Sequence, residues 1–588
     1  MVGRGQVLKG GFIGIGSNVG MIAFASSRTS TPPPARPRFT LALSVEQLLL
    51  ISSLFWLFSA NRLFFAAALK DRLASDASSW GFGLAIGVMV LALHVFLVGL
   101  VAHRWTIKPV LSVLLIGTAC ATFYMQTYGV YLDPTMLRNT LRTDPAEASE
   151  LLSLRMAGHV LLWAGLPLLA LWRVEIVRRR SWQRALGVRL GVLLLALATA
   201  VAAIMAVFQP FSSLMRNNKE IRYLITPANY IWSLGSVIAQ DLKGAAKPRQ
   251  PLGLDAKPGA QMSARAKPLV LVLVVGETAR AANWGLNGYA RQTTPQLAQV
   301  PELISLPPVE ACGTNTETSL PCMFAPIGRR DYDEARIRGS ESLLHLLARA
   351  GVQVHWRDNQ SGCKGVCDGL PNDFVDDQNA PGLCDGKRCL DEGLIADLDA
   401  RLAAAKSQSA STHLWVMHQL GNHGPSYFRR YPEAFERFKP ACQKDDLRLC
   451  SKEEIVNAYD NALLYTDHLL AELVKKLKAR SDEVDTALIY VSDHGESLGE
   501  NGLFLHGIPY AIAPKQQTQV PMLMWASPGF GANAGLDMAC LRQRASQTEP
   551  APRHDHLFHT VMGLLDVHSS VFAPEWNLAQ NCKTGAAR

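Results

Sequence analysis

The chain has 588 residues with a net charge of +9, which is too long for a single small domain. It is 48 % hydrophobic and only 18 % charged, a composition that excludes a disordered or highly charged soluble protein and is typical of a membrane protein. The apolar excess lies almost entirely before Pro210. The remainder has the composition of an ordinary globular domain.

Residues 1–40 are expected to be a disordered or cytoplasmic N-terminal extension. The stretch GFIGIGSNVG is similar to a glycine-rich nucleotide loop, but no strand of a βαβ unit precedes it, so it does not indicate a nucleotide site. TPPPARPR favours an extended lead-in, and we expect no cleaved signal peptide. Whether these residues belong to the natural protein or follow from a misplaced start is left open.

Residues 41–208 are expected to form a transmembrane domain with five helices. Each apolar stretch is long enough for a span of roughly 20 residues. The first is the weakest, because Glu46, Asn61 and Arg62 lie in it or at its edges. Polar side chains in a span are expected to face the bundle or the interface. The five stretches are residues 43–66, 80–103, 108–130, 156–176 and 186–208.

The orientation of these spans follows from the loop after the fourth one. Residues 173–189 carry six arginines against one glutamate, so this loop is expected on the cytoplasmic side. With five spans, everything after Phe208 then lies on the opposite, outer side. The basic N-terminus falls on the cytoplasmic side, which is consistent.

The cysteines support an exported C-terminal region. Of 11 cysteines, only Cys120 lies in an expected span. Eight of the others fall into close sequential pairs, and the last two can pair with each other, which suits an oxidising compartment. A zinc ribbon is the alternative, but it usually shows two CxxC pairs and this chain has none. The expected disulfide cysteines are Cys312, Cys322, Cys363, Cys367, Cys384, Cys389, Cys442, Cys450, Cys540 and Cys582.

Residues 209–267 are expected to be a connector. The stretch 213–238 mixes aromatic, apolar and basic residues and is suited to lie along a membrane surface. Residues 244–268 are rich in Pro, Gly and Lys, which is typical of a linker. A basic tether at the membrane surface and a plain solvated linker both remain open.

Residues 268–588 show strands alternating with helices, which predicts an α/β domain with a mostly parallel sheet. PLVLVLVVGE is a continuous apolar run of the kind expected for a strand covered on both faces. Helices are expected in the stretches 341–351 and 453–480. The expected strands lie in the stretches 268–277, 351–359, 411–424, 485–496 and 519–529.

Acidic and imidazole side chains follow three of these strands. Glu277 ends the first, His418 and His423 follow the third, and Asp493 and His494 end the fourth. Open α/β sheets bind ligands at the carboxyl ends of their strands, so these groups are expected to converge. A hydrogen-bonded loop histidine is the ordinary interpretation of any one of them alone. Mixed carboxylate and imidazole ligands favour zinc, or manganese, over calcium.

The stretch ACGTNTETSLPCM places four hydroxyl residues between Cys312 and Cys322. Near a dication, a threonine hydroxyl acquires a lower pKa and becomes a nucleophile for attack on phosphorus. A disulfide would then fix its position. The alternative interpretation is a turn that is closed by a disulfide and holds no nucleophile.

Four ordered motifs carry a resemblance to a known family. VVGETAR (274–280), CGTNTETSLPCMF (312–324), GNHGPSY (421–427) and SDHGESLGE (492–500) together resemble the phosphoethanolamine transferases of Gram-negative inner membranes, which include lipid A-modifying and colistin-resistance enzymes. The resemblance covers the chain from about Leu41 onward. It implies a catalytic domain with the alkaline phosphatase/sulfatase-like fold.

The resemblance assigns roles within these motifs. It implies that Thr316 is the nucleophile and that Glu277, Thr316, Asp493 and His494 bind one catalytic zinc, with a second zinc left open. It further implies that a set of residues contacts the substrates, although a solvated lysine or an exposed loop histidine is the plain alternative for several. This set is Asn139, Thr143, Glu147, Ser361, Lys364, His423 and His506, while His418 is less clearly assigned.

Asn139, Thr143 and Glu147 recur at intervals of four, which predicts that they share one helical face. A polar face of a surface helix is the ordinary interpretation of this spacing. The resemblance instead implies that they bind the ethanolamine headgroup of the donor, and a carboxylate at Glu147 suits an ammonium.

The implied reaction takes phosphoethanolamine from phosphatidylethanolamine to Thr316 and then to lipid A phosphate or another envelope glycan. It implies a monomeric multi-pass protein of the bacterial inner membrane, with its catalytic domain in the periplasm and no nucleic-acid partner. Two alternatives are a lipoteichoic acid synthase-like glycerol-phosphate transferase and a phosphodiesterase or inactive sensor of the same superfamily. The CGTNT…PC loop and the Asn139–Thr143–Glu147 stretch argue against the first, and the intact set of Glu277, Thr316, Asp493 and His494 argues against a loss of activity. The acceptor and any polymyxin resistance cannot be read from the loops.

Overall fold

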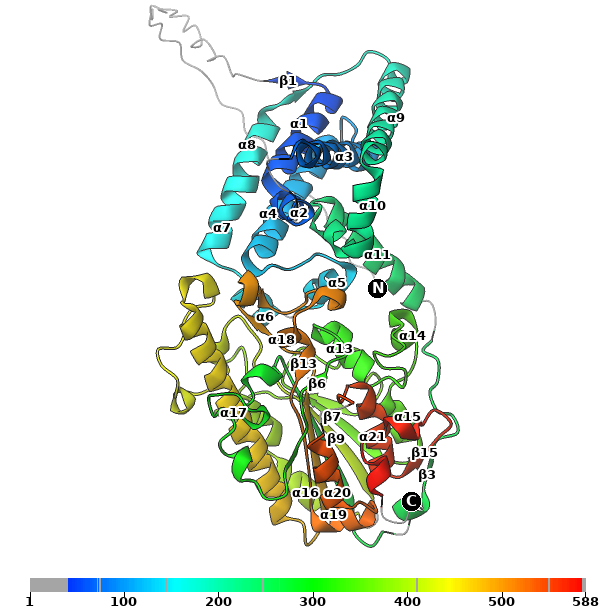
Figure 1. Ribbon diagram of the computed structural model, residues 1–588, viewed down its shortest axis with the longest axis vertical. Coiled ribbons are helices and arrows are strands. Elements are labelled where there is room, and N and C mark those ends of the chain that lie inside the picture. The colour runs from blue at the N-terminus through cyan, green and yellow to red at the C-terminus, as the bar shows by residue number, and fades with distance from the viewer. Residues whose placement is uncertain are drawn as a thin grey trace, which may run out of the picture. The chain divides into compact units, whose positions relative to one another are not determined.

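The computed structural model describes residues 41–583, apart from positions 71, 73–75, 144, 246–247, 264, 409–410 and 548–549. The expected N-terminal extension, residues 1–40, lies outside the described residues. From Ala42 onward the chain forms one compact unit. Figure 1 shows this unit with its apolar helices at the N-terminal end and its sheet near the C-terminal end.

Four helical segments among the described residues are long and apolar enough to cross a membrane, and a bent pair makes a fifth span if it is counted as one. The pair is α1 (Val45–Ala60) and α2 (Arg62–Ala68), bent by 61°. The prediction of five spans is therefore met, by length and composition, when the bent pair is counted as one span, and four helices pass without it. The four segments are α3 (Ala77–Val101), α4 (Ile107–Tyr128), Leu154–Arg173 and α9 (Trp182–Ala206); the third consists of α7 (Leu154–Val160), the π turn η1 (Leu161–Gly165) and α8 (Leu166–Arg173).

Asn61 explains the bend in the first span. Its buried side-chain amide donates to the carbonyl oxygens of Trp56 (2.9 Å) and Thr226 (2.8 Å), and its oxygen accepts from the Thr226 N–H at 3.0 Å. A buried polar group of this kind must have partners. Asn61, which made the first span look weak in the sequence, thus joins that span by hydrogen bonds to Thr226, in the segment that follows the last span.

The connector folds back onto the globular part of the chain. After the last span come α10 (Phe208–Asn217) and α11 (Ala228–Ala245). The short strand β3 (Lys257–Pro258) then pairs antiparallel with β15 (Val567–His568). The latter half of the connector is therefore attached to the C-terminal region and is not a free tether.

A seven-stranded sheet forms the centre of the C-terminal region. Strands β10, β4, β9, β7 and β8 are parallel neighbours, and β14 closes the other side antiparallel to β10. The prediction of a mostly parallel sheet is confirmed. The order is β5 (Ile304–Ser305), β14 (Met522–Ala526), β10 (Asp485–Ser492), β4 (Leu269–Gly276), β9 (Thr412–His418), β7 (Gln353–Asp358) and β8 (Asn372–Phe374).

Both faces of this sheet are covered. Alternate residues of β4 enter two different cores, because successive side chains of a strand point to opposite faces. One core contains residues of α15 (Leu343–Arg349), α19 (Pro528–Asn533), α20 (Met538–Ala545) and α21 (Asp555–Leu564). The other contains residues of α16 (Leu398–Lys406) and α17 (Lys452–Ala479). Figure 1 shows α17 on one side of the sheet and α15 and α21 on the other.

Five disulfides hold the C-terminal region, and the expected pairing of its cysteines is confirmed. The four sequential pairs close loops of 10, 4, 5 and 8 residues, and the last pair spans 42 residues. Short loops of this kind rigidify local segments of the domain. The pairs are Cys312–Cys322, Cys363–Cys367, Cys384–Cys389, Cys442–Cys450 and Cys540–Cys582.

Candidate active site

The candidate ligands lie at the carboxyl edge of the central strands. Gly276 at the end of β4 is paired with Ser492 at the end of β10, so the next residues, Glu277 and Asp493, leave the sheet side by side. His418 ends β9, paired with Val275. Parallel strands deliver their last residues to one edge, which is where α/β sheets bind ligands.

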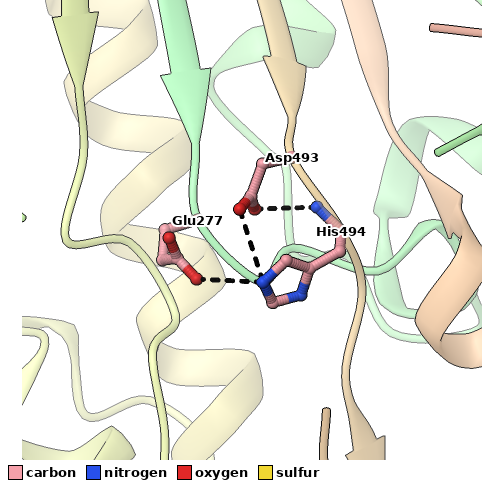
Figure 2. A group of neighbouring side chains, drawn as sticks. All are labelled: Glu277, Asp493 and His494. Carbon is pink, nitrogen blue, oxygen red and sulfur yellow. Dashed lines mark hydrogen bonds and ion pairs between the residues drawn. The ribbon is translucent and has the colours of Figure 1, made fainter. Parts of the chain in front are cut away.

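Glu277, Asp493 and His494 form one buried group, shown in Figure 2, whose donor atoms all lie within 4.8 Å of one another. The His494 Nε2 lies 3.4 Å from Glu277 Oε1 and 3.3 Å from Asp493 Oδ2. All three side chains are fully buried, and Asp493 Oδ2 has no hydrogen-bond partner among the described residues. The geometry is that of a candidate metal site.

The electrostatics of this group also fit a bound cation. Burial, reinforced by the neighbouring Asp493 carboxylate, raises the pKa of Glu277 well above its usual range. Burial likewise lowers the pKa of His494 to about 4, so the imidazole stays neutral and keeps a lone pair for a ligand. Two buried carboxylates beside a neutral imidazole suit a divalent metal, which would offset their mutual repulsion.

Gly421 lets the backbone approach this group closely. Its φ of +55° is in the left-handed region that favours glycine. A Cβ at this position would lie 2.6 Å from the Glu277 carbonyl oxygen. The glycine of the GNHGP motif is therefore required for the loop to pack against the ligand strand.

Thr316 is the first residue of helix α13 (Thr316–Met323). Asn315 caps this helix, because its side chain accepts a hydrogen bond from the Thr318 N–H, and the Cys312–Cys322 disulfide closes the segment. The Thr316 Oγ1 donates to Glu277 Oε2 at 3.0 Å and lies 3.3 Å from His494 Nε2. The hydroxyl therefore lies within the carboxylate–imidazole group.

Two further residues connect the nucleophile segment to β10. Ser319 donates its hydroxyl to the Asp493 carbonyl at 2.5 Å. His554 accepts from the Cys312 N–H at 3.1 Å and contacts the Ser492 carbonyl through Nε2 at 2.9 Å. The sequence interpretation missed both roles. The spacing of three between Thr316 and Ser319 on a helix is a signal for the serine, whereas nothing local distinguishes His554.

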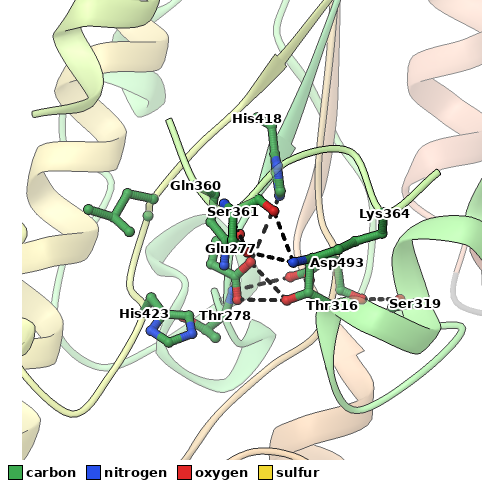
Figure 3. Close-up of polar contacts among 12 residues, drawn as sticks. Glu277, Thr278, Thr316, Ser319, Gln360, Ser361, Lys364, His418, His423 and Asp493 are labelled. Carbon is green, nitrogen blue, oxygen red and sulfur yellow. Dashed lines mark hydrogen bonds and ion pairs between the residues drawn. The ribbon is translucent and has the colours of Figure 1, made fainter. Parts of the chain in front are cut away.

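Lys364 lies in a strained loop closed by Cys363–Cys367. Its φ of 49° is left-handed, which is uncommon for a residue with a side chain. The ammonium donates to the Ser361 hydroxyl at 2.6 Å and to the Ser361 carbonyl at 3.1 Å. Figure 3 shows this lysine directed toward Ser361, beside Thr316 and Glu277. The structure thus brings both predicted residues to the site.

Three histidines form a row that begins at the ligand group. The ring centroids of His494 and His506 are 4.4 Å apart, and those of His506 and His423 are 5.3 Å apart. The row ends where His423 Nε2 lies 3.1 Å from Glu147 Oε1. His506 is held by Glu496 at 2.8 Å, a partner that the sequence interpretation did not identify.

The charges along this row are set by burial and pairing. Burial alone lowers the pKa of His506, but the nearby carboxylates, Glu496 foremost with Glu147 and Asp493, together outweigh it and raise this pKa. For Glu147, burial favours the neutral acid, yet the charges of His423, His506 and Lys364 bring its pKa down to about 2. Glu147 is therefore a buried anion that faces two imidazoles and the Lys364 ammonium of the catalytic domain.

The expectation that Asn139, Thr143 and Glu147 share one helical face is wrong. Asn139 lies in α5 (Pro134–Arg142), Thr143 ends that helix with an extended ψ of 134°, and Glu147 belongs to a new helix, α6 (Pro145–Glu150). Pro145 has no N–H to continue α5, and it starts α6 instead. Among the described residues, no hydrogen bond or ion pair joins Asn139 or Thr143 to the catalytic domain.

Two neighbouring pairs complete the surroundings. Glu150 lies one turn after Glu147 and binds two arginines of the catalytic domain, Arg430 at 2.5 Å and Arg388 at 2.8 Å. His418 donates its Nδ1–H to Asp358 Oδ2 at 2.9 Å, and its Nε2 lies 3.9 Å from Glu277 Oε2. His418 is therefore beside the ligand group, but it is not among the three residues whose donor atoms meet.

The sheet, its ligand edge and the buried hydroxyl define the class of protein. Residues 270–567 match the sulfatase family, and residues 90–242 match the family described as phosphoethanolamine transferase EptA/EptB. The alkaline phosphatase/sulfatase-like fold expected from the sequence is thereby confirmed.

Individual relatives extend these matches over most of the chain. The phosphoethanolamine transferase EptA of Escherichia coli K12 is 35 % identical over 505 residues, 85 % of this chain and 90 % of the relative. The phosphatidylethanolamine transferase Mcr-1 of Escherichia coli is 37 % identical over 538 residues, which are 89 % of this chain and 96 % of the relative. The solved integral membrane protein lipooligosaccharide phosphoethanolamine transferase A (EptA) from Neisseria meningitidis aligns with a TM-score of 0.86 at 36 % identity, covering 92 % of this chain and 100 % of that one. The chain belongs to the phosphoethanolamine transferases, which are membrane enzymes with a sulfatase-type domain.

Proposed function

We propose that this enzyme transfers phosphoethanolamine from phosphatidylethanolamine to lipid A phosphate or another envelope glycan, through a covalent intermediate on Thr316. One observation carries the mechanism: the Thr316 hydroxyl is buried within the Glu277–Asp493–His494 group, 3.0 Å from Glu277 Oε2. The names of the relatives support the donor and acceptor, since one is a phosphatidylethanolamine transferase and another acts on lipooligosaccharide.

The metal of this proposal is one zinc, held by Glu277, Asp493, His494 and Thr316. Two carboxylates, a neutral imidazole and a hydroxyl suit zinc. When bound, zinc supplies positive charge that lowers the pKa of the Thr316 hydroxyl and balances charge on the phosphoryl oxygens. A second zinc near His423 and His506 stays open.

In the first step Thr316 Oγ1 forms a bond to the donor phosphorus. The bond from phosphorus to the diacylglycerol oxygen breaks, and that oxygen takes a proton and leaves as diacylglycerol. The Thr316 proton passes first to Glu277 Oε2, which already accepts the hydrogen bond of that hydroxyl, and from there to the departing diacylglycerol oxygen. The helix cap and disulfide hold Oγ1 in place, and Lys364 offers its ammonium to a phosphoryl oxygen.

In the second step an acceptor oxygen attacks the same phosphorus. The bond to Thr316 breaks, and the threonine takes up one proton, which balances the proton that the acceptor loses. The row of His494, His506 and His423 reaches from the reacting hydroxyl to Glu147, so His506 or His423 is suited to take the acceptor's proton. Glu147 is the expected partner of the ethanolamine ammonium, which would replace His423 at its carboxylate, with Asn139, Thr143 and Ser361 completing the donor and phosphate contacts.

The proposal includes the placement of the protein. We place the spans (41–208) in the bacterial inner membrane, with the connector (209–267) and the catalytic domain (268–588) in the periplasm, as a monomer. The arginine-rich loop of residues 173–189 supports this orientation, and the five disulfides support an oxidising compartment. Both substrates of the proposed reaction are membrane lipids, which is consistent with a membrane-embedded enzyme.

The decisive experiment is mass spectrometry of the Thr316 peptide. The full chain is incubated in phosphatidylethanolamine nanodiscs, digested and sequenced. We expect a phosphoethanolamine adduct on Thr316 that disappears when lipid A is added and appears on lipid A. Thr316→Ala should remove the adduct and slow transfer at least ~10³-fold, whereas Thr318→Ala on the same helix should keep both. An adduct elsewhere, or none in the wild type, would overturn the mechanism, and a glycerol-phosphate adduct would establish the alternative transferase.

A further inference from the structure

A cavity of about 1150 Å³ lies beside the proposed active site. Its wall includes Arg138 and Arg142 of α5, residues of α14 (Glu334–Arg338) and the loop residues Ser361 and Lys364. The cavity therefore shares Ser361 and Lys364 with the proposed phosphoryl site. No function described above uses the rest of it.

The acidic groups of this wall are already neutralised. Each of its four carboxylates has an arginine partner, and these ion pairs are Glu334 with Arg138, Asp241 with Arg142, Asp368 with Arg249 and Glu341 with Arg349. A cationic ligand would have to displace an arginine to find a free carboxylate here. The cavity thus does not suit the ammonium of a donor headgroup.

Among the described residues, two cations of the wall have no carboxylate within ion-pair distance. The hydrogen bonds of the Lys364 ammonium in this part of the chain go to the neutral oxygens of Ser361. Arg336 is exposed, and its guanidinium makes no hydrogen bond or ion pair within the part of the chain that the structure describes. The cavity therefore presents one free cation beside the proposed phosphoryl site and another on α14.

Helix α5 contributes residues to this cavity and also carries Asn139, one of the residues expected to contact the donor. Arg138 and Arg142 are four residues apart and line the cavity, whereas Asn139 and Thr143 form the adjacent stripe. Thr143 is followed by α6, on which Glu147 meets His423. The cavity arginines and the expected headgroup ligands thus occupy adjacent positions of α5 and its C-terminal end.

We propose that this cavity binds the acceptor, as a glycolipid carrying phosphate groups. Arg336 takes one phosphate with its forked guanidinium, and Lys364 lies where a second phosphate would approach the group on Thr316. A donor held near Glu147 and an acceptor in the cavity would both reach the same hydroxyl. This site rests on the proposed function, because only a transferase needs a second lipid substrate.

The test separates binding from chemistry. Fluorescent bisphosphorylated lipid A is titrated into full-length Thr316→Ala protein in nanodiscs, where no transfer occurs. Adding Arg336→Glu to this protein should raise the Kd for lipid A at least tenfold. With Arg336→Lys instead, the Kd should lie between those of the Thr316→Ala protein and the Arg336→Glu variant. Arg542→Glu is the matched control, because it makes the same charge change at an exposed position of α20, outside this cavity. Its Kd for lipid A should stay within twofold of that of the Thr316→Ala protein. Equal effects of Arg336→Glu and Arg542→Glu would reduce the finding to general attraction of an anionic lipid and overturn the proposal.

The kinetic arm uses the active chain. Arg336→Glu should raise the KM for lipid A at least tenfold and leave adduct formation on Thr316, measured without acceptor, within twofold. Slower adduct formation would make the cavity a donor site, and an unchanged KM would exclude it as an acceptor site; either overturns the inference.

A competition experiment tests the selectivity of the cavity. Phosphatidylglycerol added in excess should not displace the fluorescent lipid A. If it competes as well as unlabelled lipid A, the cavity is a general anionic-lipid site and the inference is overturned. Failure of the proposed function is distinct, because the wild type would then form no adduct, while the titration still reports on the cavity.

Discussion

Two segments bring groups to the same reaction centre by different means. The nucleophile segment, residues 312–324, is held locally, by a disulfide ten residues apart and by a side-chain cap three residues away. The docking segment, residues 134–150, is held by ion pairs to distant positions: Arg142 reaches Glu317 across 175 residues, and Glu150 reaches Arg430 across 280. Local constraints fix the orientation of one hydroxyl, whereas distant charge pairs determine which surfaces meet.

The charges of the docking segment are reversed between its two helices. Helix α5 supplies arginines to the carboxylates Glu317 and Glu334, and α6 supplies the carboxylates Glu147 and Glu150 to histidine and arginine. A shifted arrangement would bring like charges together, which is costly away from water. The pattern therefore specifies one docked arrangement, with Glu147 at the end of the histidine row.

The largest effect is expected from Glu150→Ala. Arg430 is fully buried, and its guanidinium would lose the carboxylate that balances it, leaving an uncompensated charge. Removing one partner of a buried pair costs about 3–5 kcal/mol. We expect a lower unfolding temperature in detergent and slower adduct formation on Thr316, because Glu147 on the same helix loses its position.

The neighbouring Arg429→Ala is the control for that variant. Arg429 is exposed and pairs with Asp445 only at 3.4 Å, so its loss should cost about 0–1 kcal/mol. Glu150→Asp should recover part of both readouts. Unaltered stability and adduct rate in Glu150→Ala would show that α6 is positioned by packing and not by charge.

A smaller loss of stability is expected when the nucleophile segment loses its disulfide. Replacing Cys312 and Cys322 by serine opens a short loop and should cost about 2–3 kcal/mol. The adduct rate at Thr316 should fall further than this loss explains, by about 10²-fold, because small displacements of a nucleophile are costly. Both quantities are measured at a temperature where the variant remains folded.

The matched control is the Cys540–Cys582 disulfide, which closes a longer loop of 42 residues away from Thr316. Replacing this pair by serine should lower stability by a similar or larger amount and leave the adduct rate within about twofold. Equal rate losses in both double variants would mean that the first disulfide stabilises the domain without placing the nucleophile.

The same contrast explains what could be predicted from the sequence. Continuous apolar runs identified the central strands, and the residues after them, Glu277, Asp493 and His494, indeed meet at one edge. The cysteine bracket identified the segment of Thr316, and sequential spacing identified the disulfides. Each of these inferences depends on neighbours within a few residues, where strand and turn geometry is nearly fixed.

The missed features depend on tertiary contacts. Glu150, Glu496 and His554 act through partners 280, 10 and 242 residues away, and no local pattern marks the first and last. The interval of four from Asn139 to Glu147 passes over Pro145, and a helix cannot continue unbroken through that proline. A periodicity count ignores that missing N–H, and so it predicted one face where the chain turns.

His554 offers a last and smaller test, because it joins the nucleophile segment to β10 by hydrogen bonds to Cys312 and Ser492. Burial lowers the pKa of this imidazole to about 4, against about 6.5 in an unfolded chain. Between those values the unfolded state binds a proton that the folded state does not bind. The free energy of unfolding therefore falls as the pH drops from about 6.5 to 4, by on the order of 3 kcal/mol. His554→Gln, which can accept and donate but does not titrate, should flatten the pH dependence of the unfolding temperature relative to wild type, since every other acid-sensitive group is unchanged. Identical slopes in the two proteins would mean that His554 is not held neutral, and that the contact to Ser492 does not fix the segment.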